Sequence, residues 1–423
     1  MTSFFIETYG CSHNFADSEQ MGGVLKQAQF EPAESIEKAD IVIFNTCTVK
    51  SPTADAFFNR LEEIKNAYPY KSIIIAGCIP QTDPERLKKF SLLGTRQIHR
   101  IVEIVEETLN NNIVKMLETG EMPPLDLPRI RKNPFIEVIP INRGCLSRCS
   151  FCKTKAARGD LQSYPISEIV KAAQKAVLDG VKEIWLTSQD TGCYGFDIKT
   201  NLPSLLCELV KISGDFKIRV GMMNPQHILR IRSELIAMYK HEKVFKFLHL
   251  PLQAGSNAVL LKMARGYTVE QFMEVYGEFK REIPELNIMT DIIVGFPTET
   301  EEDYWQTLNI VRQMNPDSIN ISRFWARPKT PAAKLEPLSP DVVKHRSKVL
   351  MDVFQNISKM QNERWMGWEG VIIIDEKGEM PSQWIGRNYA YKQVIVEGDY
   401  KLGDLLKVKV NVANVWDLRG ISI

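Results

Sequence analysis

The chain of 423 residues is long enough for about three domains of ordinary size. Its hydrophobic content of 44%, charged content of 25% and net charge of +1 exclude a membrane span and binding of nucleic acid through a global positive field. The N-terminus lacks the basic and apolar regions of a signal peptide. Eight cysteines in such a chain favour metal or redox chemistry over disulfides. We therefore expect a cytoplasmic monomer that does not bind a membrane.

The first third of the chain alternates between strands and helices. Strands are predicted over 4–10, 39–47 and 71–78, and amphipathic helices over 17–30, 53–68 and 83–90. This alternation predicts a parallel α/β sheet in a domain spanning 1–125, because parallel neighbours need a crossover connection. Ligands of such sheets bind beyond the carboxyl ends of the strands.

One cysteine stands at or just past each of these strands: Cys11, Cys47 and Cys78. Each of them alone could be a small buried hydrophobic residue. The repetition at three equivalent strand ends favours a shared metal instead. The sequence therefore predicts a metal site at the carboxyl edge of this sheet.

A longer alternation follows the loop "PPLDLPRIRKNP". Six strands are predicted, over 135–142, 183–189, 216–223, 245–253, 287–296 and 318–327, with amphipathic helices between them. Six βα units predict a partial TIM-like (β/α)6 barrel within 131–362, with its active site at the carboxyl ends of the strands.

Three further cysteines lie close together in "INRGCLSRCSFCKTKAARG", with the spacing Cys145-x3-Cys149-x2-Cys152. A structural zinc site wants a fourth ligand, and this loop contains no histidine and no further cysteine. Cysteines at this kind of spacing hold 4Fe–4S clusters, and three of them leave one iron free. The motif at the mouth of a TIM-like barrel resembles the radical S-adenosylmethionine (SAM) superfamily. The resemblance implies that SAM itself fills the free position and that the three cysteines are catalytic.

Polar and glycine positions at the other strand ends fit a site for this cofactor. The candidates are Gln189, Asp190, Arg219, Gln253, Ser256 and Gly295. A glycine allows the backbone to approach a ligand closely, and arginine could neutralise a carboxylate. Each position could equally be a turn or capping residue. Cys207 is expected in a helix core, and Cys193 is a loop thiol without an evident partner.

The segment from 363 to the end changes character after a long predicted helix. Short β-rich runs separated by Gly, Asp and Pro predict a small antiparallel β-barrel. Aromatic and basic residues interleave at Arg387, Tyr389, Tyr391 and Lys392. Such residues suit contacts with unpaired RNA bases, although aromatic residues in strands are usually core.

From end to end the chain resembles a methylthiotransferase of the radical SAM superfamily. The resemblance rests on "TYGCSHNFADSE", "NTCTV" and "AGC", on "GCLSRCSFCKTKAARG", and on "LPLQAGSNAVLLKMARGYT", "TDIIVGFPTET" and "KVKVNVANVWDLRG". It implies a flavodoxin-like N-terminal domain with an auxiliary 4Fe–4S cluster on Cys11, Cys47 and Cys78. It also implies a radical SAM barrel with a second cluster and a C-terminal RNA-binding TRAM domain.

The residues after the third cysteine of the central motif, "CKTKAARG", resemble the archaeal and eukaryotic members that act on tRNA N(6)-threonylcarbamoyladenosine. The substrate then carries a free carboxylate, for which Lys153, Lys155 and Arg158 are the candidate contacts. The resemblance implies tRNA, a reducing electron donor and a sulfur source as partners. The alternatives are a methylthiotransferase for isopentenyladenosine tRNA or for an aspartate of a ribosomal protein, and a zinc-dependent RNA-binding protein without catalysis.

Overall fold

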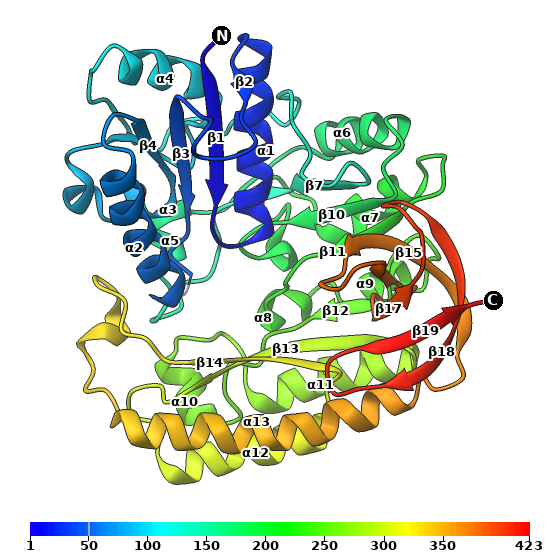
Figure 1. Cartoon of the computed structure of the whole chain (residues 1–423). Helices are drawn as coiled ribbons and strands as arrows, with labels where there is room; N and C mark the ends of the chain where they lie inside the picture. The colour runs from blue at the N-terminus through cyan, green and yellow to red at the C-terminus, as the bar shows by residue number, and fades with distance from the viewer. Residues whose placement is uncertain (50) are drawn as a thin grey trace.

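The computed structural model describes residues 1–49 and 51–423, which form three packed bodies in chain order (Figure 1). The first is a six-stranded parallel sheet in the order β2-β1-β3-β4-β5-β6. The strands are β1 (Ser3–Thr8), β2 (Glu31–Pro32), β3 (Ile41–Thr46), β4 (Ser72–Gly77), β5 (Ser91–Leu93) and β6 (Lys115–Met116). Helices α1 (Ser12–Gln27), α2 (Ser51–Ala67), α3 (Cys78–Thr82) and α4 (Ile101–Leu109) connect them. Since all six residues of β3 are buried, the sheet is covered on both faces, as parallel sheets are.

The second body is an open barrel of six parallel strands. Two three-stranded sheets, β11-β10-β7 and β12-β13-β14, meet where Ile218 bridges to Val244. The strands are β7 (Ile136–Pro140), β10 (Glu183–Thr187), β11 (Lys217–Val220), β12 (Phe247–His249), β13 (Asn287–Val294) and β14 (Ser318–Arg323). The predicted partial (β/α)6 barrel is confirmed, and its order follows the chain.

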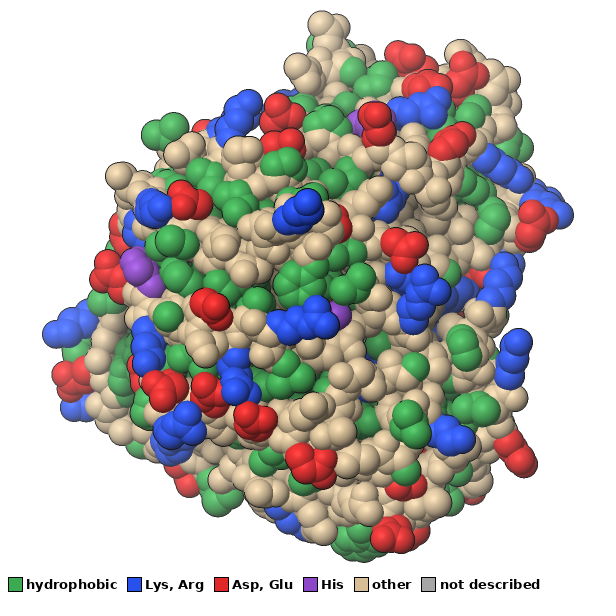
Figure 2. Space-filling model, turned by 180° about the vertical axis from the view of Figure 1, so that it is seen from behind, with side chains coloured by type: hydrophobic (Ala, Val, Ile, Leu, Met, Phe, Trp, Pro, Cys, Tyr) green, Lys and Arg blue, Asp and Glu red, His purple; other side chains and the backbone are tan. Residues whose placement is uncertain are grey.

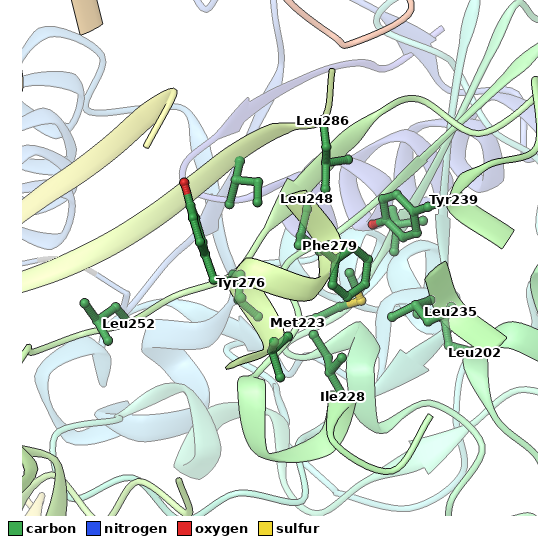
Figure 3. Close-up of a cluster of buried hydrophobic side chains, with 14 of the residues drawn as sticks. Leu202, Met223, Ile228, Leu235, Tyr239, Leu248, Leu252, Tyr276, Phe279 and Leu286 are labelled. Atoms are coloured by element: carbon green, nitrogen blue, oxygen red, sulfur yellow. The ribbon is translucent and has the colours of Figure 1, made fainter. Parts of the chain in front are cut away.

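Helices surround this barrel and bury the main core of the chain against it. They are α6 (Ile166–Leu178), α7 (Leu202–Val210), α9 (Arg232–Tyr239), α11 (Val269–Glu282), α12 (Glu301–Met314) and α13 (Pro340–Glu363). Short elements complete the body: β8 (Asn142–Arg143), α5 (Thr154–Arg158), β9 (Gln162–Ser163), α8 (Pro225–Ile228) and α10 (Asn257–Lys262). Figure 3 shows how Leu235, Tyr239 and Phe279 on the helices pack with Leu248 from β12. Capping boxes at Thr268 and Thr300 fix the starts of α11 and α12.

The third body is a closed five-stranded barrel in the order β15-β16-β17-β19-β18. Its strands are β15 (Glu369–Lys377), β16 (Gln383–Arg387), β17 (Gln393–Glu397), β18 (Leu405–Ala413) and β19 (Leu418–Ser422). The prediction of a small barrel is confirmed. The pairing differs in one place, because β17 and β19 run parallel while the other pairs are antiparallel.

The C-terminal barrel covers the amino ends of the central strands. The backbone carbonyl of Tyr389 accepts a hydrogen bond from the Lys246 amide at 2.8 Å, just before β12. The carbonyl of Ala390 accepts one from Asn287 Nδ2, at the start of β13, at 3.2 Å. The carboxyl ends of the central strands therefore stay available to the N-terminal body.

The first predicted domain boundary falls in a connection between strands, whereas the second falls inside a helix. Residues 125–131 lie in the connection between β6 and β7, whereas residue 362 lies in the last turn of α13. Acidic and basic side chains are interspersed over the face in Figure 2, in keeping with the small net charge. Within the described ranges, no helix is both long and apolar enough to cross a bilayer.

Candidate active site

The three N-terminal cysteines meet at the carboxyl edge of the first sheet. Cys11 is the N-cap residue of α1, Cys47 follows β3, and Cys78 begins α3 directly after β4. Gly10, at a φ of 104°, passes so close that a Cβ there would lie 2.4 Å from the Cβ of Cys47. Burial, together with the neighbouring thiols Cys78 and Cys11, raises the pKa of Cys47 to about 12. The structure thus brings together three thiols that the sequence separates by more than thirty residues.

The central cysteines occupy the loop between β8 and α5, beyond the carboxyl end of β7. Arg265, which is half-buried, donates from Nη1 to Cys149 Sγ at 3.1 Å. The Ser147 amide donates to Cys145 Sγ at 3.3 Å. The expectation that Cys193 lacks a partner is wrong, because its thiol hydrogen-bonds Cys145 and lowers the pKa of Cys145 to about 6. The loop therefore favours the thiolate form of Cys145, whereas burial raises the pKa of Cys152.

A buried ionic cluster joins the two triads of cysteines. Arg158, at the end of α5, donates from Nη1 to Asp17 Oδ2 at 2.8 Å, and Arg143 donates to Asp17 Oδ1 at 2.8 Å. Each of the three side chains is 1% exposed. Arg158 also hydrogen-bonds the Cys78 thiol, an interaction that opposes the upward shift in the pKa of Cys78 caused by burial. Sequence reasoning missed Asp17 and Arg143, and it assigned Arg158 to the substrate; the structure gives it an interdomain role instead.

The two lysines of the central loop have partners within the chain. Lys153 Nζ contacts Asp83 Oδ2, five residues after Cys78, and the Lys153 side chain is 8% exposed. Lys155 Nζ contacts the Cys145 carbonyl and lies 2.7 Å from Asp160 Oδ1. Neither lysine stands free to meet a substrate in this arrangement, because both hold the loop in place.

Gln189 and Asp190 lie beside the central cysteines, as predicted for residues at the end of β10. Gln189 Oε1 accepts from the Gly144 amide at 2.7 Å, and its Nε2 lies 3.1 Å from His13 Nδ1 in α1. Asp190 Oδ1 accepts from the Asn224 amide at 3.0 Å. Burial raises the pKa of Asp190 to about 8. These contacts couple the cysteine loop to both α1 and the barrel.

Three other predicted cofactor contacts lie in different surroundings. Ser256 caps α10 and donates to Asp303, so it is a capping residue. Gly295 makes room for α13, because a Cβ there would lie 2.5 Å from Val343 Cγ2. Arg219 is held among aromatic rings, with its guanidinium 5.0 Å from the ring centres of Trp185 and Tyr391 and 5.2 Å from that of Phe247. The structure gives all three positions a packing or capping role.

A cavity of about 180 Å³ opens at the carboxyl ends of β13 and β14. Alternate side chains of β13, Asp291 and Ile293, line it. His249 Nε2 lies 2.9 Å from Asp291 Oδ2, and Asn320 Nδ2 donates to Asp291 Oδ1 at 2.8 Å. The remaining lining comes from both cysteine loops and from the segment after β14, and it includes Val49, Phe151, Gln253, Arg323, Trp325 and Arg327. Of these, sequence reasoning identified only Gln253.

The predicted RNA contacts of the C-terminal segment already have partners within the chain, in the C-terminal barrel itself or in the central body. Arg387 Nε lies 3.0 Å from Asp375 Oδ2, and Lys392 Nζ lies 2.9 Å from Asn362 Oδ1 at the end of α13. Tyr391 packs on Phe245 with ring centres 5.0 Å apart. Tyr389 is the most exposed of the four, at 36%, and it packs on Trp365.

Comparisons with known proteins match both cysteine-bearing bodies. Residues 3–93 match the uncharacterized protein family UPF0004, and residues 139–311 match the radical SAM superfamily. The chain is 42% identical to a human protein named threonylcarbamoyladenosine tRNA methylthiotransferase, over 93% of the chain and 69% of that protein. It is 40% identical to the Xenopus laevis protein of that name, over 98% and 76%. A Pyrococcus horikoshii protein with the same name, qualified as probable, is 42% identical over 90% of each.

Solved structures share the arrangement at low identity. The radical SAM methyltransferase TsrM from Kitasatospora setae aligns with a TM-score of 0.56 at 14% identity, over 78% of this chain and 74% of its own. The cobalamin-dependent SAM radical enzyme OxsB aligns with a TM-score of 0.52 at 14% identity, over 85% and 56%. These likenesses show the fold.

Proposed function

Since the chain belongs to the threonylcarbamoyladenosine tRNA methylthiotransferase family, we propose that it converts N(6)-threonylcarbamoyladenosine beside the tRNA anticodon to its 2-methylthio derivative. The observation that carries this proposal is that the loops holding two cysteine triads, from two different bodies, line one cavity through Val49, two residues after Cys47, and Phe151, between Cys149 and Cys152. A reaction that joins a methylthio group to an adenine needs both a sulfur-bearing centre and a radical-generating centre within reach of the same base.

The residues present fit two 4Fe–4S clusters. Each triad supplies three thiols, one fewer than a fully ligated cluster takes, which leaves one iron of each cluster open. We assign Cys11, Cys47 and Cys78 to the auxiliary cluster and Cys145, Cys149 and Cys152 to the SAM-binding cluster. When bound, the clusters and SAM supply the sulfur, the methyl group and the radical that removes hydrogen from carbon 2 of adenine.

The side chains of the chain hold and polarise these centres. Arg265 donates to Cys149 at 3.1 Å and Arg158 hydrogen-bonds Cys78, so a guanidinium stands beside one sulfur of each triad. Hydrogen bonds to charged sulfur are stronger than those between neutral groups. Each arginine therefore contacts its sulfur more strongly when that sulfur carries negative charge, as a metal-bound thiolate does. Radical chemistry is needed because acid–base catalysis contributes only ~10²–10⁴-fold, too little for a carbon-bound proton of such low acidity.

The proposed reaction also requires a macromolecular substrate, a reductant and a source of sulfur. We propose tRNA as the macromolecular substrate, an external reductant for the SAM-binding cluster, and a source of sulfur for the auxiliary one. The C-terminal barrel supports an assignment as a TRAM domain that binds RNA. The cytoplasmic location and the monomeric state stay predictions from the sequence.

The direct test is mass spectrometry of nucleosides from tRNA incubated with the anaerobically reconstituted protein, SAM and dithionite. The 2-methylthio derivative of threonylcarbamoyladenosine is expected, and it should be absent when the tRNA carries unmodified adenosine or isopentenyladenosine. A product on isopentenyladenosine tRNA alone would show that isopentenyladenosine, and not threonylcarbamoyladenosine, is the substrate. A colourless protein that binds zinc and gives no product on any tRNA would favour the non-catalytic alternative.

The two triads can be tested separately. Replacing Cys11, Cys47 and Cys78 together by Ala should leave reductive cleavage of SAM intact and abolish methylthio transfer, with bound iron falling by about half, since one of two equal clusters is lost. The corresponding change at Cys145, Cys149 and Cys152 should stop the cleavage itself. The expectation that Cys207 lies in a helix core is wrong, because it is exposed on α7; Cys207→Ala is therefore the matched control and should change neither. Catalytic methylthiolation by the first triple variant would refute the assignment of the auxiliary cluster.

A further inference from the structure

The cavity between the two cysteine triads contains a buried arginine that no side chain neutralises directly. Arg327 is 8% exposed and lines this cavity. Its guanidinium makes neither a hydrogen bond nor an ion pair with any residue in 1–49 or 51–423. Burial lowers its pKa, and the more distant charges of Cys47, Cys152 and Asp55 oppose that shift. An arginine nevertheless stays protonated in proteins, so a full positive charge faces the cavity.

Three other cations around the two triads have carboxylate partners, and Arg265, which contacts the Cys149 thiol, does not line the cavity. Lys153 contacts Asp83, Lys155 contacts Asp160, and Arg158 contacts Asp17. Arg323 also lines the cavity but is exposed, so water can solvate it. A buried charge without a partner is costly, and one anion entering with a ligand would remove that cost. Arg327 is therefore the position in this cavity where binding of an anionic group of a substrate would be most favourable.

The surroundings of Arg327 suit a purine that carries such a group. Trp325, two residues earlier, is 47% exposed at the cavity and offers a flat ring on which an unstacked base can lie. Phe151, between Cys149 and Cys152, supplies a second aromatic side chain from the cysteine loop itself. A base stacked here would lie within the space bounded by both cysteine loops.

We propose that Arg327 binds the carboxylate of the threonylcarbamoyl group and thereby selects the substrate nucleotide, an inference that rests on the proposed function. The planar guanidinium can donate two parallel hydrogen bonds to a carboxylate, which a lysine cannot do. An isopentenyl group has no charge to offer, so Arg327 would remain unpaired beside it. The pocket would then discriminate through the cost of an unpaired charge as well as through the contact it makes.

Binding of anticodon stem–loops to the reconstituted full chain tests the proposal without turnover. Three stem–loops differ only at the target adenosine, which carries a threonylcarbamoyl group, its methyl ester, or no modification. Fluorescence anisotropy should show the wild type preferring the free carboxylate by about 10- to 100-fold, the range given by a hydrogen bond to a charged group. Arg327→Met should bind all three stem–loops alike, and Arg327→Lys should keep part of the preference.

The matched controls are Arg281→Met, on the exposed side of α11, and Arg323→Met at the open edge of the cavity; both should keep the preference. Equal weakening of all three stem–loops by Arg327→Met would show a phosphate contact and overturn the proposal. Loss of bound iron in that variant would also overturn it, by assigning Arg327 to the clusters, as would an unchanged preference. A wild type that prefers the carboxylate yet forms no methylthio product would instead count against the proposed function.

Discussion

A buried ionic cluster of Asp17, Arg143 and Arg158 lies between the two cysteine triads. Asp17 lies on α1 of the N-terminal body, and both arginines come from the central barrel. One carboxylate thus pairs with two guanidiniums in a region closed to water. The cluster fixes the position of the cysteine loop relative to the first sheet, because Arg158 ends the short helix that follows Cys152.

Asp17→Asn should strongly destabilise the contact between the two bodies. The amide keeps the size of the side chain but leaves two buried guanidiniums without a counter-charge, and breaking a buried pair costs about 3–5 kcal/mol. The first unfolding transition in urea should shift accordingly. Lys38→Met is the matched control, since Lys38 and Glu34 form an exposed pair, 66% and 83% accessible, and exposed pairs contribute about 0–1 kcal/mol. Equal shifts in the two variants would show that the ionic cluster does not hold the bodies together.

The loop between β16 and β17 closes the amino end of the central barrel. Tyr391 enters among Trp185, Phe245 and Phe247, with ring centres 6.2, 5.0 and 5.2 Å away, and it lies against the guanidinium of Arg219. Lys392 is buried against Asn362 and Asp317. Removing the C-terminal barrel would therefore expose the interior of the central barrel as well as remove the segment proposed to bind RNA, so a deletion cannot separate the two roles.

Tyr391→Ala should lower stability by at most about 3–5 kcal/mol, the usual cost of deleting a large buried aromatic ring, because Tyr391 is half-buried. Tyr391→Phe keeps the ring and its packing, so we expect a loss below about 1.5 kcal/mol. Melting temperatures followed by circular dichroism would measure both. Iron content should stay at the wild-type value in each variant, because Tyr391 lies at the end of the central barrel opposite the cysteines. Similar melting temperatures for the alanine variant and the wild type would show that packing of Tyr391 against the central barrel contributes little to stability.

At the scale of the whole molecule, the sequence predicted what depends on local patterns. The alternation of strands and helices and the close spacing of Cys145, Cys149 and Cys152 are local, and both were sufficient for the fold and the reaction class. The partner of Arg158 was not predictable, because Asp17 lies 141 residues away and only the packing of two bodies brings them together. The contact of Lys153 was not predictable for the same reason, since its partner Asp83 belongs to the other body. Tyr391 was ambiguous, as its residue type suits a core and an RNA surface equally.

The small net charge requires that tRNA binding depend on local cations, and the outer face of the C-terminal barrel offers them. Along β18 the exposed Lys407 and Lys409 alternate with the buried Val408 and Val410, and Arg419 on the paired strand β19 is exposed as well. Lys409 pairs with Glu369, but both are 48% exposed, and such a pair yields readily to a phosphate.

Replacing Lys407, Lys409 and Arg419 together by Gln should flatten the dependence of log K for tRNA on log salt concentration by roughly 2–3, since each lost phosphate contact releases ~0.7–0.9 fewer counterions. The control changes Lys38, Lys211 and Lys240 to Gln, which lowers the net charge from +1 to −2 in the same way but at exposed positions outside this barrel. The control should leave the slope close to that of the wild type, because counterion release depends on the phosphates that are contacted. An equal flattening in both variants would mean that tRNA responds to total charge, and the barrel face would lose its assignment as the RNA anchor.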